Sequence, residues 1–108
     1  MIRGAVYQID LGHPRGHEQH GRRYGLVVSP SDTPWSVATV IPTSTSAQPA
    51  VFRPEVEIAG RPTRLLVDQI RSIDTAYMGE LVDMLSRTAM LEVDDTLARY
   101  LGLLPMLY

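Results

Sequence analysis

Alternating apolar and polar residues predict β-strands along the first part of the chain. Residues 4–10 alternate with a period of two, which is typical of a strand that buries one face. Two runs rich in β-branched residues follow at 24–29 and 36–41, and the Ser-Pro-Ser-Asp-Thr-Pro segment between them predicts a turn. We expect Pro42 to end the second of these strands, because proline lacks the backbone N–H that a strand interior uses.

Strand-like patterns continue beyond this proline. Three further segments are predicted to contain strand: 51–58, 63–67 and 69–74. Residues 80–85 fit either a short strand or a helical turn, and we favour the strand. Gly60 predicts the turn between the first two of them. The polar pair Asp68 and Gln69 interrupts an otherwise apolar stretch, and a buried polar pair would need hydrogen-bond partners.

The periodicity changes near Ser86. Apolar residues recur at steps of three and four from Met90 to Leu101, which predicts an amphipathic helix over 87–101. Ser86 suits its N-cap, and Gly102 suits its end. Closely spaced strands followed by one helix predict an α+β, mostly β fold, in which a small and strongly bent sheet or partly open barrel is capped by the C-terminal helix.

Composition narrows the class of protein. The chain has 108 residues, 44% of them hydrophobic and 20% charged, which is typical of one globular domain, predicted over 1–108. It has no cysteine, which excludes disulfides, thiol nucleophiles and Cys-containing zinc motifs. Because no apolar run suits a secretion signal or a membrane span, we expect a soluble, cytoplasmic protein.

Charge is distributed unevenly. The net charge is −2, but residues 1–64 carry seven arginines and five acids, whereas residues 65–108 carry three arginines and seven acids. All ten basic residues are arginine, and a guanidinium group can bind two phosphate oxygens at once. The first part of the chain therefore favours a phosphate-binding face, although a general bias in composition would give the same enrichment.

A polar loop over 12–21 carries three histidines, His13, His17 and His20. Three imidazoles can bind zinc and leave a fourth position open. The glycines and proline of this loop prevent the helix that would align the histidines. We therefore expect no metal ion and no cofactor, and histidines that are solvated or contact phosphate.

The loop and the hydroxyl-rich segment Thr43-Ser44-Thr45-Ser46 together suit the cleavage of RNA. The 2′-hydroxyl of RNA is an internal nucleophile, so the reaction needs a proton acceptor, a proton donor and positive charge near the phosphorane. The same residue types on separate loops are also common as solvated side chains and turn caps.

Four motifs in sequence order resemble the MazF/PemK/Kid toxins of type II toxin–antitoxin systems. They are Arg3-Gly4-Ala5-Val6-Tyr7, Gly16-His17-Glu18-Gln19-His20-Gly21-Arg22-Arg23, Val40-Ile41-Pro42-Thr43-Ser44-Thr45 and Val67-Asp68-Gln69-Ile70-Arg71. Together with Leu26-Val27-Val28-Ser29-Pro30 and the terminal helix, they cover almost the whole chain. The resemblance implies a CcdB/PemK-like, Src-homology-like antiparallel barrel.

For function, the resemblance implies a metal-independent, sequence-specific endoribonuclease that cuts single-stranded RNA and thereby inhibits translation and growth. Its products would carry 2′,3′-cyclic phosphate and 5′-hydroxyl ends. It further implies a homodimer that an antitoxin neutralises. Apolar residues beyond the helix, from Leu103 to Tyr108, agree with a dimer, although they could also pack within the chain.

The resemblance also points to individual site residues. The family's catalytic arginine falls on Arg23 and its Glu-Gln pair on Glu18 and Gln19. The catalytic threonine of its Pro-x-Thr motif falls on Ser44, which keeps a hydroxyl, and Thr43 or Thr45 could replace it. We expect Arg23 to bind the scissile phosphate and Glu18 or His17 to take the 2′-hydroxyl proton. The predicted RNA-binding residues are Arg15, His17, Gln19, Arg22, Thr43, Thr45, Gln69 and Arg71.

Some alternatives stay open at this point. Leu66 stands where some members of the family carry an arginine, which disfavours a mechanism built on Asp68. Arg71 could instead pair with Asp68 or Asp74, and Trp35 could either stack on a base or cover the core. A gyrase poison like CcdB is disfavoured because the chain ends Leu-Pro-Met-Leu-Tyr rather than Trp-Gly-Ile. A domain that binds RNA without cutting it is the other alternative.

Overall fold

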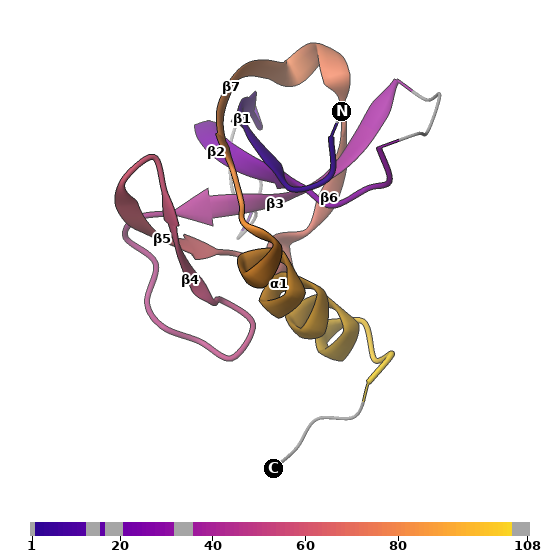
Figure 1. Cartoon of the computed structure of the whole chain (residues 1–108). Coiled ribbons are helices and arrows are strands. Elements are labelled where there is room, and N and C mark those ends of the chain that lie inside the picture. The colour runs from indigo at the N-terminus through magenta and orange to yellow at the C-terminus, as the bar shows by residue number, and fades with distance from the viewer. Residues whose placement is uncertain (1, 13–15, 17–20, 32–35, 105–108) are drawn as a thin grey trace.

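One strongly curled antiparallel sheet and a C-terminal helix make up the computed structural model (Figure 1), which describes residues 2–12, 16, 21–31 and 36–104. The elements in chain order are β1 (Ala5–Asp10), β2 (Arg22–Val27), β3 (Val37–Ser44), β4 (Glu55–Ile58), β5 (Arg61–Leu65), the 3₁₀ turn η1 (Val67–Gln69), β6 (Arg71–Asp74), the 3₁₀ turn η2 (Thr75–Tyr77), β7 (Met78–Met84) and α1 (Arg87–Tyr100). The predicted fold class is confirmed. None of the helices in these residues is long and apolar enough to cross a membrane.

The sheet has the strand order β4-β5-β3-β2-β1-β7, and β6 pairs with β3 outside this path. β3 is the central strand. Along one side it pairs with β2, and along the other it pairs first with β6 through residues 37–40 and then with β5 through Thr43 and Ser44. This change of partner bends the sheet into a partly open barrel.

Pro42 does not end β3, contrary to the prediction. It lies between the segment of β3 that pairs with β6 and the segment that pairs with β5, and its carbonyl accepts a hydrogen bond from the Leu66 amide. A proline is tolerated at this point because no ladder bond requires its missing N–H. The strand therefore continues to Ser44 and delivers the hydroxyl-rich segment to the end of the sheet.

Two other predicted strands are shorter in the structure. The segment predicted at 51–58 is strand only over Glu55–Ile58, and Val51 lies in a turn with 75% of its surface exposed. Val67 belongs to η1 instead of the strand predicted at 63–67, where its amide donates to the Phe52 carbonyl. In both segments, hydrogen bonds between loops, such as that from Val67 to Phe52, replace the pairing of neighbouring strands.

Two apolar clusters lie on opposite faces of the curled sheet. Val6, Leu26 and Ile41 are aligned across β1, β2 and β3 and pack toward Val93 and Leu97 of α1. The second cluster contains Ile9, Leu11, Val27, Val40 and Ile73. The prediction that β1 buries only one face is therefore wrong. The helix α1 covers one face of the sheet, and the curl of the sheet encloses the other.

The helix confirms its predicted bounds to within one residue. The Ser86 hydroxyl accepts a hydrogen bond of 3.1 Å from the Ala89 amide, as expected of an N-cap. Gly102 adopts a φ of +75° just after the helix, a conformation that glycine tolerates best. With both ends fixed, α1 lies across one end of the barrel (Figure 1).

Candidate active site

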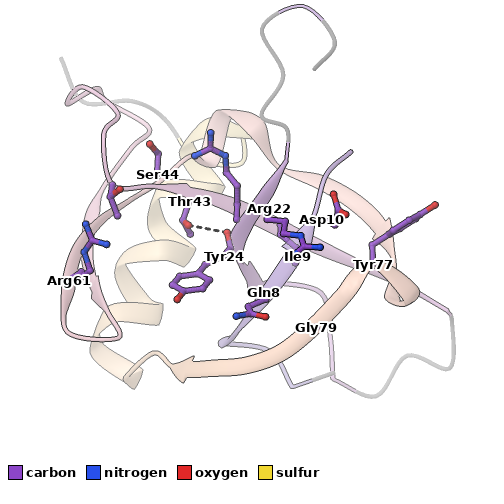
Figure 2. A pocket seen from close by; sticks show the side chains of 12 residues that line it. Gln8, Ile9, Asp10, Arg22, Tyr24, Thr43, Ser44, Arg61, Tyr77 and Gly79 are labelled. Carbon is purple, nitrogen blue, oxygen red and sulfur yellow. Dashed lines mark hydrogen bonds between the residues drawn. The ribbon is translucent and has the colours of Figure 1, made fainter. Parts of the chain in front are cut away.

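An open groove of about 530 Å³ lies where β1, β2 and β3 meet the start of β5 and the η2–β7 segment. Figure 2 shows its side chains gathered over the curved sheet. The lining residues are Gln8, Ile9, Asp10, Arg22, Arg23, Tyr24, Thr43, Ser44, Thr45, Arg61, Tyr77 and Gly79.

Strand register explains why these residues meet. β1 and β2 pair with Ile9 opposite Arg23 and Asp10 opposite Arg22, so the two strands end at the groove together. The long β3 passes beside β2 and brings Thr43 and Ser44 to the same place. Residues distant in sequence therefore form one surface.

Positive charge dominates the groove. Among the residues that the structure describes, its lining contains the three arginines Arg22, Arg23 and Arg61 and one carboxylate, Asp10. One Asp10 oxygen accepts a hydrogen bond of 2.9 Å from the Gly12 amide, which uses part of its acceptor capacity. Guanidinium groups in such an excess favour an anionic ligand, and their planar geometry suits phosphate oxygens.

The three candidate hydroxyls differ in their hydrogen bonds. The Thr43 hydroxyl donates to the Tyr24 carbonyl at 3.0 Å, so its proton is already used. The Ser44 Oγ accepts from the amides of Ser46 at 3.2 Å and Ala47 at 3.0 Å, and it lies 3.4 Å from the Ser46 Oγ. Only 6% of Ser44 is exposed. Thr45 is exposed, and no hydrogen bond between described residues involves its hydroxyl.

The structure brings together part of the predicted site. Arg22, Arg23, Thr43, Ser44 and Thr45 all line the groove, whereas Gln69 in η1 and Arg71 in β6 are absent from its lining. The other predicted residues lie outside the described residues: Arg15, His17, Glu18 and Gln19, as well as His13, His20 and Trp35. Within the described part of the chain, no three His, Cys, Asp or Glu side chains are grouped to hold a metal ion.

Five polar or aromatic residues of the lining were not predicted from the sequence: Gln8, Asp10, Tyr24, Arg61 and Tyr77. The alternation of residues 4–10 already placed Gln8 and Asp10 on one face of β1 and could have identified them. Arg61 and Tyr77 gave no such signal, because they reach the groove only through the curl of the sheet. Figure 2 shows them at opposite ends of the groove.

Asp68 is engaged away from the groove. Its carboxylate accepts two hydrogen bonds from Arg53, at 2.9 and 2.8 Å. These bonds hold the pKa of the Asp68 carboxyl below its ordinary value, against the opposing effect of partial burial. Arg53, which was not among the predicted partners, is thus a bidentate partner of Asp68. Leu66, two residues before Asp68, is fully buried.

Comparison with known proteins agrees with this fold and groove. Residues 2–101 match the family of PemK-like, MazF-like toxins of type II toxin–antitoxin systems. The protein Rv3098A of Mycobacterium tuberculosis is 62% identical over 105 residues, which cover 95% of this chain and 99% of the relative. The endoribonuclease MazF of Staphylococcus epidermidis is 34% identical over 110 residues, covering 94% and 91%.

Solved structures have the same architecture. The crystal structure of MazF from Deinococcus radiodurans superposes with a TM-score of 0.81 at 26% identity, covering 92% of this chain and 94% of that chain. An endoribonuclease from a mycobacterial species, solved in complex with its cognate antitoxin, also gives 0.81 at 19% identity, covering 98% and 99%. At this lower identity the likeness concerns the fold.

A curled barrel with an arginine- and hydroxyl-lined groove defines a small protein suited to bind a phosphate-bearing ligand. The extent of the sequence match makes the assignment specific. The chain belongs to the MazF/PemK family of type II toxin–antitoxin toxins, a family that includes endoribonucleases.

Proposed function

We propose that the chain is a metal-independent, sequence-specific endoribonuclease that cleaves single-stranded RNA by attack of the 2′-hydroxyl on the adjacent phosphate. The observation that carries this proposal is the convergence of Arg22 and Arg23 with the hydroxyls of residues 43–45 in one groove. These groups can bind a phosphodiester and stabilise the charge that develops on it during the reaction.

The reaction conserves atoms and charge through an internal displacement. The 2′-oxygen forms a bond to phosphorus while its proton passes to a base, and the bond from phosphorus to the 5′-oxygen then breaks. The leaving 5′-oxygen takes up a proton. The products are a 2′,3′-cyclic phosphate and a 5′-hydroxyl, and no external water enters this step.

Arg23 supplies the positive charge at the reacting phosphate. A guanidinium group keeps its proton at any physiological pH, so Arg23 cannot serve as the base. Its useful property is a planar pair of N–H donors that can hold two phosphate oxygens as negative charge accumulates on them. The neighbouring Arg22 adds a further cation for the RNA backbone.

Ser44 donates a hydrogen bond to the same phosphate in this proposal. Two backbone amides already donate to its oxygen, so its proton can go to the Ser46 Oγ at 3.4 Å or to a bound phosphate. The Thr43 proton is bound to the Tyr24 carbonyl, so Thr43 is less suited to this role. Thr45, exposed at the rim, is the alternative donor.

Glu18 or His17 moves the 2′-hydroxyl proton. Both belong to the segment between β1 and β2, and both strands end at the groove, at Asp10 and Arg22. The same connection carries Arg15 and Gln19, which we propose as RNA contacts. Gln69 and Arg71 would contact RNA only where it extends beyond the groove.

Tyr77 offers a surface for a base. It is 59% exposed and lines the groove at the end away from Arg61 (Figure 2). Bases of single-stranded RNA stack readily on exposed aromatic rings. We assign to Tyr77 the stacking role for which the sequence offered Trp35.

We also propose that the chain forms a homodimer and binds an antitoxin whose tail is acidic and hydrophobic. Leu101, Leu103 and Leu104 are exposed beyond α1, which leaves apolar surface for a second copy. Carboxylates of the antitoxin would occupy the arginine-lined groove in place of phosphates. Sedimentation as a monomer at micromolar concentration would contradict the dimer, and simultaneous binding of RNA and antitoxin at the groove would contradict the competition.

The test is incubation of the purified protein with a long single-stranded RNA in excess EDTA, followed by analysis of the new ends. We expect cuts at one short sequence, with cyclic phosphate and 5′-hydroxyl ends. Full dependence on added magnesium or zinc would contradict the mechanism. Tight binding without cleavage would instead identify a protein that sequesters RNA.

A further inference from the structure

We propose that Arg61 forms a second phosphate-binding subsite beside the cleavage centre, and that Asp83 positions it by holding the β4–β5 hairpin against β7. This inference rests on the proposed function and identifies a part of the substrate, a backbone phosphate next to the one that is cut. Neither residue belongs to the motifs that relate the chain to its family.

Arg61 has the properties of a ligand-binding cation. It is exposed, lines the groove at the end opposite Tyr77 (Figure 2), and makes no ion pair with any residue that the structure describes. Arg64, on the same strand, instead donates to the Arg53 carbonyl and lies 3.8 Å from Glu55. Only one of the two β5 arginines is thus left for an external anion.

The backbone under Arg61 is held in place. It follows a two-residue turn, Ala59 and Gly60, with φ values of +50° and +79°, which joins strands paired from Ile58 to Arg61. Two positive φ values are typical of the tight turns that match the twist of a hairpin. The Thr63 hydroxyl also donates to the Arg61 carbonyl at 3.0 Å.

Asp83 ties this turn to the other end of the sheet. Its Oδ2 accepts a hydrogen bond of 2.9 Å from the Ala59 amide, while its Oδ1 accepts from the amide of Met84. β4 and β7 are the terminal strands of the sheet order, so this contact joins the two ends of the curled sheet. A register shift between β1 and β7 lies beside Asp83, which pairs with Val6, and such irregularities commonly redirect a side chain.

The binding test uses single-stranded RNA in which every 2′-hydroxyl is methylated, so that binding is measured without cleavage. Arg61→Ala should weaken binding roughly tenfold, as expected for one charged hydrogen-bonding contact. It should also reduce the slope of log K against log salt by about 0.7. Arg87→Ala removes an exposed arginine of α1 outside the groove and is the matched control, with no change in slope expected.

Neutral methylphosphonates placed one at a time along this RNA locate the contact. One position should weaken binding to the wild type but have no effect on binding to Arg61→Ala. If every position weakens both proteins equally, Arg61 binds no particular phosphate and the inference is wrong. Because cleavage is measured separately on ordinary RNA, a wild type that fails to cut would overturn the proposed function without affecting this result.

The positioning role of Asp83 is tested by whether its substitution tightens or weakens RNA binding. Removal of a negative charge alone should tighten RNA binding, whereas loss of a positioning contact should weaken it. We expect Asp83→Ala to weaken binding of the methylated RNA. The double variant should bind no more weakly than Arg61→Ala alone. Asp83→Asn keeps an oxygen for the Ala59 amide but loses the charge, so it should bind at least as tightly as the wild type. Additive losses, or tighter binding by Asp83→Ala, would overturn the positioning role. If Asp83→Ala does not fold, it is replaced by Asp83→Ser, whose side chain is shorter than that of aspartate.

Discussion

The arginines near α1 and those of the groove have opposite surroundings. Near the helix, Arg3 pairs with Asp94 at 2.6 Å and Arg53 pairs with Asp68 through two bonds. In the groove, the described part of the lining carries three arginines and one carboxylate. Arginine thus joins secondary-structure elements on one side of the molecule, whereas on the other side it lines the groove.

The difference separates arginines that stabilise the fold from arginines that line the candidate site. Arg53 and Asp68 connect the loop after β3 to η1, and the Tyr100 hydroxyl of α1 donates to the Asp68 carbonyl at 3.3 Å. The groove instead gathers the positive charge of Arg22, Arg23 and Arg61, which can attract a phosphate. Substitutions should therefore affect folding on the helix side and RNA cleavage on the groove side.

The largest effect is expected at Arg23. Arg23→Lys keeps the charge but loses the planar pair of donors, so it should be nearly as inactive as Arg23→Ala, each losing at least about 100-fold in single-turnover cleavage. Thermal unfolding should stay close to that of the wild type. A folded, RNA-binding Arg23→Lys that cuts at the wild-type rate would show that the geometry of the guanidinium group is irrelevant.

The next largest effect is expected for Tyr77→Ala, which should weaken RNA binding. Loss of a stacked base costs about 1–3 kcal/mol, or roughly 5- to 150-fold in the dissociation constant. Tyr77→Phe keeps the ring and should bind like the wild type, which makes it the matched control. Equal losses in both variants, measured by fluorescence anisotropy on uncleavable RNA, would assign the effect to the hydroxyl.

Ser44 should show a smaller, mixed effect, because its hydroxyl both holds the backbone after β3 and lines the groove. Ser44→Ala removes the acceptor for the amides of Ser46 and Ala47 and should cost about 1 kcal/mol in stability. Cleavage should fall about tenfold, the value of one hydrogen bond to a charged phosphate. Ser44→Thr keeps the hydroxyl and should cut within a few-fold of wild type. Full activity of Ser44→Ala, beside impaired Thr45→Ala, would transfer the role to Thr45.

The smallest effect on cleavage is expected at Asp68. Asp68→Asn should lower the free energy of unfolding by about 1–2 kcal/mol, since the pair is bidentate but about a third exposed. RNA cleavage should not change. Asp95→Asn, in an exposed pair of α1, is the control and should cost less than about 0.5 kcal/mol.

The loss of folding stability caused by Asp68→Asn should depend on pH. The folded protein lowers the pKa of the Asp68 carboxyl, so the carboxylate contributes its full stability above the unfolded pKa of about 4. This contribution is lost as the pH falls through the lower, folded pKa. Thermal unfolding of the wild type and Asp68→Asn should therefore converge below about pH 4, and a constant difference at every pH would contradict the assignment.

Sequence patterns predicted most of the fold because local periodicity determines it. The helix at 87–101, the strand at 4–10 and the turn at Gly60 each follow from neighbouring residues. Pro42 misled the prediction, since its place between two successive strand partners depends on tertiary pairing. Arg61 and Tyr77 were not predicted as groove residues for the same reason. Arg23 and Ser44 were predicted as site residues because their motifs could be compared with a family.

The most direct test of the account is the 2′-hydroxyl itself. Two RNAs of identical sequence, one with a single deoxyribose 5′ to the cut phosphate, are incubated with the wild-type protein in EDTA under single-turnover conditions. The account predicts that the all-ribose RNA is cut at that site and that the deoxyribose RNA binds equally well but resists cleavage there. Efficient cleavage of the deoxyribose RNA at the same phosphate would contradict the internal-nucleophile mechanism.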